Sequence, residues 1–179
     1  MKKMNEILIA GFGGQGVLFS GRVLACAGLL ADKEVSWMPS YGPEMRGGTC
    51  NCSVIISDDK IGSPIILNAD ILIALNLPSI LKFEKFVKPG GLIFLDSAIA
   101  DKKIERTDTK NYYIPAARLA DENGVAGLAN MIMAGKVIKE TGVSDISFIR
   151  AAMEQAVPDR KKDLLEANLK AIDIGYNYM

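Results

Sequence analysis

The chain has 179 residues, of which 49% are hydrophobic, and this predicts one domain over residues 1–179 with a sizeable core. Its 21 basic and 21 acidic side chains cancel, so no global field favours nucleic acid or an anionic membrane as a partner. Histidine is absent, which removes the usual side chain for acid–base catalysis and the commonest metal ligand. The apolar runs are too short for a membrane span or a signal peptide, so we expect a cytoplasmic protein.

Apolar runs of strand length recur along the first two thirds of the chain, at residues 7–10, 35–38, 52–56, 71–75, 92–95 and 112–114. Most are continuous, which is typical of strands buried on both faces of a mostly parallel sheet. Helix-length segments are predicted at residues 17–31, 78–87, 128–141, 146–156 and 158–173. This pattern predicts an α/β fold: a Rossmann-like three-layer sandwich with right-handed crossovers, a mostly parallel sheet and a helical C-terminal portion. We expect Gly142 to end the helix at residues 128–141 and Ser144 to cap the helix at residues 146–156.

A glycine-rich turn follows the first apolar run and leads directly into the first predicted helix. Its candidate residues are Gly11, Gly13, Gly14, Gln15 and Gly16. A strand, a tight turn and a helix start let backbone N–H groups approach a phosphate. The alternative is that the glycines serve only a tight turn and close packing of the helix on the strand.

The turn also fits the G-x-G-x-x-G pattern of dinucleotide-binding proteins, which needs an acidic residue at the end of the second strand. The nearest acidic residues, Asp32 and Glu34, lie before or at the start of that strand. They are at the wrong end, so the sequence argues against ordinary NAD binding.

A second glycine-rich loop connects the second and third predicted strands. Its candidate residues are Tyr41, Gly42, Glu44, Met45, Arg46, Gly47, Gly48 and Thr49. Long loops inside compact domains are usually functional, and glycines let backbone N–H groups join the Arg46 guanidinium around an anion. Glu44 could hold Arg46 in place or contact a neighbouring chain. A solvated surface arginine is the alternative.

No catalytic pair is evident in the sequence. The serines and the three cysteines, Cys26, Cys50 and Cys52, have no histidine to activate them. Nor do they form a zinc or cluster-binding set, so no metal site is predicted; Cys50 and Cys52 should be free thiols on one face of a strand. Asp96, at a strand's carboxyl end, is either a ligand-site residue or the cap of the turn beginning at Ser97. Catalysis would need a cofactor from outside, which favours a subunit role.

Together, the two glycine-rich stretches and the following residues 49–55 resemble the gamma subunit of 2-oxoacid:ferredoxin oxidoreductases over essentially the whole chain. This family acts on pyruvate, ketoisovalerate or 2-oxoglutarate, and residues 41–48 look most like the 2-oxoglutarate branch. The resemblance implies a complex that converts a 2-oxoacid and coenzyme A to acyl-CoA and CO2, passing two electrons to ferredoxin.

The same resemblance implies how the work is divided among subunits. Thiamine diphosphate would lie on companion alpha and beta subunits, and iron–sulfur clusters on beta or a delta subunit. This gamma-type domain would contribute assembly and coenzyme A binding, through residues 11–16 and 41–49 with Arg46 as the charged contact, and be inactive alone. Two alternatives stay open: a stand-alone NAD(P)-binding oxidoreductase and a purely structural assembly module.

Overall fold

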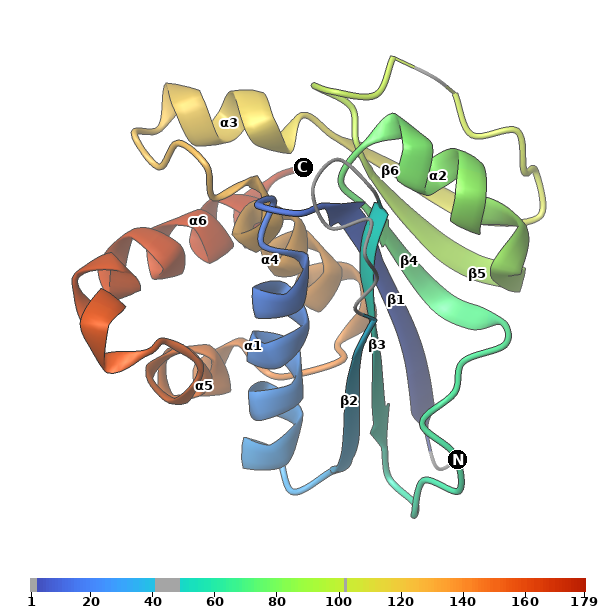
Figure 1. Cartoon of the computed structure of the whole chain (residues 1–179), viewed down its shortest axis with the longest axis horizontal. Helices are drawn as coiled ribbons and strands as arrows, with labels where there is room; N and C mark the ends of the chain where they lie inside the picture. The colour runs from blue at the N-terminus through green and yellow to red at the C-terminus, as the bar shows by residue number, and fades with distance from the viewer. Residues whose placement is uncertain (1–2, 41–48, 102) are drawn as a thin grey trace.

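The computed structural model describes residues 3–40, 49–101 and 103–179 (Figure 1). The strands are β1 (Met4–Phe12), β2 (Glu34–Ser40), β3 (Thr49–Ser57), β4 (Ala69–Ala74), β5 (Val87–Asp96) and β6 (Lys110–Ile114). The α-helices are α1 (Val17–Leu30), α2 (Leu77–Phe83), α3 (Ala116–Glu122), α4 (Ala129–Thr141), α5 (Ile149–Ala156) and α6 (Leu165–Asn177). Short 3₁₀ helices are η2 (Glu84–Phe86), η3 (Ile146–Phe148) and η4 (Asp159–Leu164). Within the described ranges, no helix has the length and apolar character needed to cross a membrane.

The strands form one sheet in the order β2-β3-β1-β4-β5-β6. β1, β4, β5 and β6 pair in parallel, whereas β3 is antiparallel to both β1 and β2, so β3 alone runs against the other strands of this sheet. The predicted mostly parallel sheet is therefore confirmed. A simple β1-α1-β2 crossover would place β2 beside β1, but β3 lies between them. A connection between parallel neighbouring strands needs a dozen or more residues, and only the eight residues 41–48 join β2 to β3. β3 therefore pairs antiparallel with β2.

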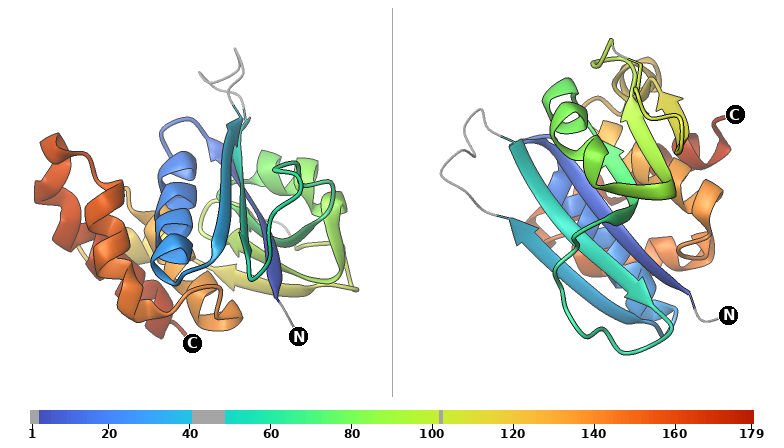
Figure 2. Two further views of the ribbon diagram at one scale, coloured as in Figure 1. Left: turned by 90° about the horizontal axis from the view of Figure 1, so that it is seen from below. Right: turned by 90° about the vertical axis from the view of Figure 1, so that its right-hand side faces the viewer.

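Helices cover both faces of the sheet, which confirms the three-layer prediction (Figures 1 and 2). On the face that carries α1, α4, α5 and α6, Ile7 and Ile9 of β1 are completely buried. Leu8 and Ala10 point to the other face, where they join the core beneath α2. The continuous apolar run at residues 7–10 thus serves two cores at once.

Several predicted boundaries differ from those observed. The helix predicted at residues 78–87 ends at Phe83 and continues only as the 3₁₀ turn η2, because Val87 already pairs with Ala69 of β4 as the first residue of β5. α3 was not predicted. Ser144 is not the cap of the next helix: the Asp145 side chain accepts the Ser147 N–H at 2.8 Å instead. Gly142 ends α4 with φ 60°, as predicted.

Two glycines allow α4 and α6 to cross at backbone contact. A Cβ on Gly135 would lie 2.1 Å from the Ile172 carbonyl oxygen, and one on Gly175 would lie 1.8 Å from the Ile132 carbonyl oxygen. Both distances are far below a van der Waals contact, so each position requires glycine. This crossing joins the helical C-terminal portion to the rest of the fold.

A polar network ties the end of the chain to the sheet. The Lys136 ammonium, on a side chain that is 9% exposed, donates to Glu140 Oε1 at 2.7 Å and to the Tyr178 carbonyl at 2.9 Å. Tyr112 Oη of β6 donates to Glu140 Oε2 at 2.6 Å. The Lys136 bond, and then that of Tyr112, lower the pKa of Glu140 below its ordinary value of 4.5.

This network predicts a pH-dependent stability difference for Glu140→Gln. Because the folded-state pKa of Glu140 is lowered, its stabilisation is present above pH 4.5 and is lost as pH falls through the folded pKa. At pH 7 the variant should lose about 1–2 kcal/mol in urea unfolding, since the carboxylate is only partly buried. Below pH 4.5 the difference in unfolding free energy between Glu140→Gln and the unaltered chain should become smaller. Glu122 pairs with Arg118 on the surface, so Glu122→Gln is the control and should change the unfolding free energy little at either pH. A gap that is the same at both pH values would contradict this assignment.

Candidate functional site

The glycine-rich turn between β1 and α1 has the backbone geometry that glycine permits. Gly14 and Gly16 adopt φ 96° and 76°. A Cβ on Gly16 would lie 2.3 Å from Asn130 Nδ2, and one on Gly11 would lie 2.8 Å from a Val17 methyl carbon. The glycines therefore do provide tight turning and close packing, which the sequence offered as one of two interpretations.

Gln15 locks this turn onto the end of β4. Its Oε1 accepts the Phe12 N–H at 2.7 Å and Asn76 Nδ2 at 2.8 Å, while its Nε2 donates to the Leu75 carbonyl at 3.0 Å. Asn76 is buried and also caps α2 by accepting the Ser79 N–H. The Gln15 amide is thus committed to holding the loop in place.

We expect Gln15→Leu to destabilise the chain by about 2–3 kcal/mol. The substitution leaves the Phe12 N–H, the Leu75 carbonyl and the Asn76 amide without their partner, and unsatisfied buried groups are costly. Urea unfolding measures this loss. Gln155→Leu, on the exposed face of α5, is the matched control and should change stability by less than about 0.5 kcal/mol. Equal stabilities for the two variants would refute the locking role.

The N-terminus of α1 has first-turn N–H groups that no described residue accepts. Its N-cap, Gly16, supplies no side-chain hydrogen bond, and the first turn carries no acidic residue. Ser20 N–H already bonds the Gly16 carbonyl, but in the described structure the N–H groups of Val17, Leu18 and Phe19 have no acceptor. Free first-turn N–H groups and the helix dipole favour a phosphate or a carbonyl oxygen.

The strand register brings the two ends of the second loop to the same edge of the sheet. Phe12, the last residue of β1, pairs with Thr49, the first residue of β3. Asn51 pairs with Ala10 on one side and with Ser40, the last residue of β2, on the other. The second loop therefore ends beside the residue from which the first glycine-rich turn departs, and it starts one strand further away.

Most residues of that second loop lie outside the described part of the chain. These are Tyr41, Gly42, Glu44, Met45, Arg46, Gly47 and Gly48, whereas the backbone of Thr49 is described. Their role in binding stays a prediction.

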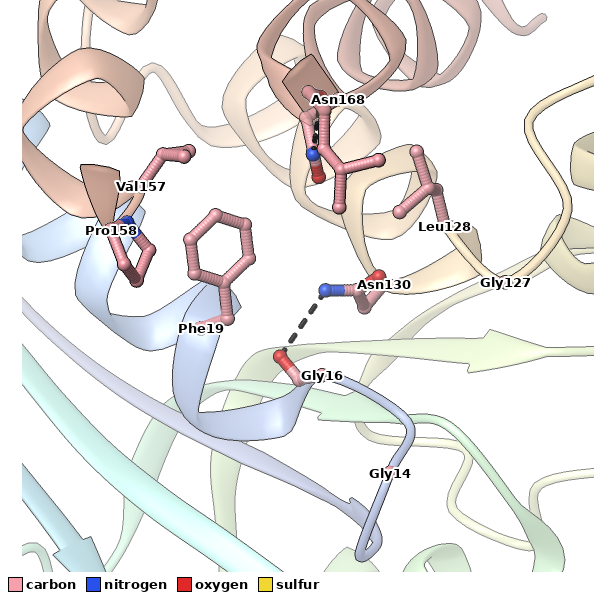
Figure 3. Close-up of a pocket in the computed structure, with 10 residues that line it drawn as sticks. Gly14, Gly16, Phe19, Gly127, Leu128, Asn130, Val157, Pro158 and Asn168 are labelled. Carbon is pink, nitrogen blue, oxygen red and sulfur yellow. Dashed lines mark hydrogen bonds between the residues drawn. The ribbon is translucent and has the colours of Figure 1, made fainter. Parts of the chain in front are cut away.

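Two hollows lie where α1 and α4 begin. They have volumes of about 260 and 200 Å³ and share Gly14, Gly127 and Asn130. We call the larger one the α6 pocket, because Asn168 of α6 lines it (Figure 3). Leu164, the last residue of η4, lines it as well. Phe19 and Leu128 add apolar walls.

Asn130 connects these hollows to the glycine-rich turn. The side chain is 4% exposed, and its Nδ2 donates to the Gly16 carbonyl at 3.2 Å and to Ser20 Oγ at 3.1 Å (Figure 3). Sequence reasoning missed both Asn130 and Asn168. An asparagine on the apolar face of a predicted helix was the available signal, because buried amides need partners.

The remaining chemically active side chains are structural. Asp96 is fully buried and accepts the Ala98 N–H at 3.0 Å and the Ala117 N–H at 3.2 Å, so it caps the turn and joins β5 to α3. Burial raises its pKa. Cys50 and Cys52 are free and buried on one face of β3, as predicted, and burial raises the pKa of Cys52 to about 12. That thiol stays protonated at neutral pH and is no nucleophile.

The geometry also disfavours the dinucleotide interpretation. Glu34 pairs with Ser57, which pairs with Met4, so Glu34 lies where β1 begins. The glycine-rich turn follows Phe12, at the other end of β1, about 25 Å away at the usual rise per residue. Asp32 precedes Glu34 and is exposed, so neither carboxylate can reach a ribose bound at the turn.

Known proteins are similar to this chain over nearly its whole length. The chain is 38% identical over 175 residues to ketoisovalerate oxidoreductase subunit VorA of Methanothermobacter marburgensis, covering 97% of this chain but 36% of VorA. It is 35% identical over 179 residues to 2-oxoglutarate synthase subunit KorC of Methanocaldococcus jannaschii, covering 98% of this chain and 94% of KorC. The chain thus spans about a third of VorA and nearly all of KorC.

Solved structures share the fold as well. The gamma subunit of a keto/oxoacid ferredoxin oxidoreductase from Geobacter sulfurreducens superposes with a TM-score of 0.82 at 29% identity, over 96% of both chains. A 2-oxoglutarate:ferredoxin oxidoreductase from Magnetococcus marinus, with 2-oxoglutarate, coenzyme A and succinyl-CoA bound, superposes with a TM-score of 0.86 at 25% identity, over 98% of this chain and 31% of that one. Residues 6–178 match the family described as pyruvate ferredoxin/flavodoxin oxidoreductase, and the chain belongs to that family.

Proposed function

We propose that residues 1–179 form a single gamma-type domain of a cytoplasmic 2-oxoacid:ferredoxin oxidoreductase. The complex would carry out coenzyme A-dependent oxidative decarboxylation of a 2-oxoacid, with 2-oxoglutarate converted to succinyl-CoA. This chain would contribute assembly and part of the coenzyme A site, and would be inactive alone.

The observation that carries this proposal is the meeting of two glycine-rich segments at one edge of the sheet. Thr49 pairs with Phe12, so the loop bearing Arg46 returns to the sheet where the glycine-rich turn that leads into α1 begins. Backbone N–H groups and a guanidinium are the donors that bind phosphate oxygens. In this proposal Gly11, Gly13, Gly14 and Gly16 let the backbone approach the coenzyme A phosphates, Gln15 holds the turn, and residues 41–49 supply Arg46.

The chemistry of decarboxylation and electron transfer would come from partner subunits. Thiamine diphosphate, which stabilises the carbanion left by decarboxylation, would lie on alpha and beta subunits, with iron–sulfur clusters on beta or delta passing electrons to ferredoxin. The chain's own composition supports this division, since it has no histidine and only three cysteines. Of these, Cys50 and Cys52 are buried against the helical layer.

The choice of 2-oxoglutarate rests on length and on the resemblance of residues 41–48, not on overall identity, which is 38% to VorA and 35% to KorC. KorC, named for 2-oxoglutarate, matches this chain end to end, whereas VorA, named for ketoisovalerate, matches over about a third of its own length. Branched-chain 2-oxoacids are the competing substrates. The residues that discriminate between them would lie near the thiamine on other chains.

Anaerobic affinity purification of the full chain from its native cell tests the proposal. We expect thiamine- and cluster-bearing subunits to co-purify, with ferredoxin reduction that requires both coenzyme A and 2-oxoglutarate. Faster reduction with 2-oxoisovalerate would overturn the substrate assignment only. A chain that is recovered alone and binds NAD(P) would overturn the family role altogether.

A purely structural assembly module is the second candidate function. The commitment of Gln15 to three internal hydrogen bonds favours it, because that amide is occupied without any ligand. A module of this kind predicts that variants of the glycine-rich loops change the yield of the complex but leave the KM for coenzyme A untouched.

A further inference from the structure

The α6 pocket contains a buried acceptor without a donor. Asn168 is 4% exposed, and its Nδ2 donates to the Leu164 carbonyl at 2.7 Å. Its Oδ1 is shielded from water and has no hydrogen-bond partner among the described residues. Of the two polar atoms of the Asn168 amide, only Nδ2 can donate to the Leu164 carbonyl. This bond therefore identifies Oδ1 as the atom without a partner. Figure 3 shows the amide reaching from α6 into the pocket.

The opposite side of the same pocket presents donors. The N-termini of α1 and α4 both reach it, at Gly16 and Leu128, and neither helix has a side-chain cap or an acidic residue in its first turn. Within the described ranges, the N–H groups of Ala129 and Asn130 have no acceptor, like those at the start of α1. Two helix dipoles therefore favour an oxygen atom here.

Between these polar groups the pocket is apolar and uncharged. Phe19, Leu128 and Val157 line it, and no described lining residue carries a charge. Its volume of about 260 Å³ suits a slender group of roughly ten heavy atoms, given the space that a water molecule takes in the liquid. The Leu164 side chain is 41% exposed, so it can turn toward solvent and admit a donor to Asn168 Oδ1.

We infer that the α6 pocket binds a secondary amide on a flexible, uncharged chain. The amide carbonyl oxygen accepts from the first-turn N–H groups of α4, since those of α1 face the phosphates in the proposed function, and the amide N–H donates to Asn168 Oδ1. On the proposed coenzyme A role, on which this assignment rests, the group in the α6 pocket is the pantetheine arm. That arm carries two such amides between apolar methylene groups. Arg46 acts on the phosphates and Asn168 on the arm.

Pantetheine itself is the probe, because it has the amides and lacks every phosphate. In ¹H–¹⁵N spectra of the full chain under reducing conditions, we expect it to shift the Asn168 side-chain amide and the backbone signals of Gly16 and Gly127. Asn168→Leu should weaken pantetheine binding about tenfold. The same substitution should raise the Tm, since it removes an unsatisfied buried acceptor.

Asn177→Leu is the matched control on the same helix. Asn177 also donates to a carbonyl four residues back, that of Asp173, but it is exposed and lies outside the pocket. We expect it neither to weaken pantetheine binding nor to raise the Tm. Spectra of the unaltered chain decide the question even if Asn168→Leu fails to fold.

The outcomes separate this inference from the proposed function. Pantetheine that shifts none of these signals at about 10 mM, or that binds Asn168→Leu unchanged, overturns the pocket assignment. If Arg46→Ala then still raises the KM for coenzyme A, the phosphate role of Arg46 stands without the pocket assignment. If pantetheine binds in the pocket and Arg46→Ala leaves the KM for coenzyme A unchanged, the pocket assignment is supported and the phosphate role of Arg46 is refuted.

Discussion

Gly175→Ala is expected to destabilise the chain by about 3 kcal/mol or more, although alanine is normally the better helix former by about 1 kcal/mol. The new Cβ would lie 1.8 Å from the Ile132 carbonyl oxygen, so α4 and α6 must separate by more than an ångström. That separation opens the core around Ile132, which is fully buried. Urea unfolding at neutral pH measures the effect, and the sign of the change is as informative as its size.

Gly135→Ala and Gly62→Ala complete the test. Gly135 faces the Ile172 carbonyl oxygen at 2.1 Å from the other helix, so its alanine variant should be destabilised comparably. A Cβ on Gly62 would meet nothing within 4 Å, and alanine there should be neutral within about 0.5 kcal/mol. Stability gains at Gly135 and Gly175 would show that the helices do not cross at backbone contact.

Arg46→Ala is expected to raise the KM for coenzyme A of the assembled complex by about ten- to a hundredfold. On the proposed role, the variant loses one charge-assisted hydrogen bond to phosphate, worth about 1.5–3 kcal/mol. Arg46→Lys should recover part of the loss, because lysine keeps the charge but not the planar fork of donors. Steady-state kinetics of ferredoxin reduction, with the 2-oxoacid saturating, gives the KM directly.

Arg118→Ala controls for the loss of a positive charge. Its side chain is 66% exposed and pairs with Glu122 at 3.7 Å on the surface of α3, so the KM for coenzyme A should stay unchanged. Subunit content, checked by gel filtration, separates a binding defect from a failure of assembly. An intact Arg46→Ala complex with an unaltered KM would refute the phosphate role of Arg46.

Local signals in the sequence were sufficient for the six strands, for most of the helices and for the first glycine-rich turn. The run at residues 7–10, the glycines after it and the helix that follows act through neighbouring residues, so their pattern predicts β1, the turn and α1. The end of α4 at Gly142 is equally local. The short α3 was missed because seven residues give little periodicity. Its first turn is also fixed by a distant residue, since Asp96 at the end of β5 accepts the Ala117 N–H.

What the sequence by itself determined is the α/β class, the position of the first glycine-rich turn and the exclusion of histidine chemistry, since each follows from composition or short-range pattern. Only the tertiary structure decided that β3 lies between β1 and β2, because strand order depends on pairings between distant residues. It also decided that Asn130 meets Gly16 across 114 positions and that Asn168 closes the pocket beside them. Those contacts are made by helix packing, which no local spacing encodes.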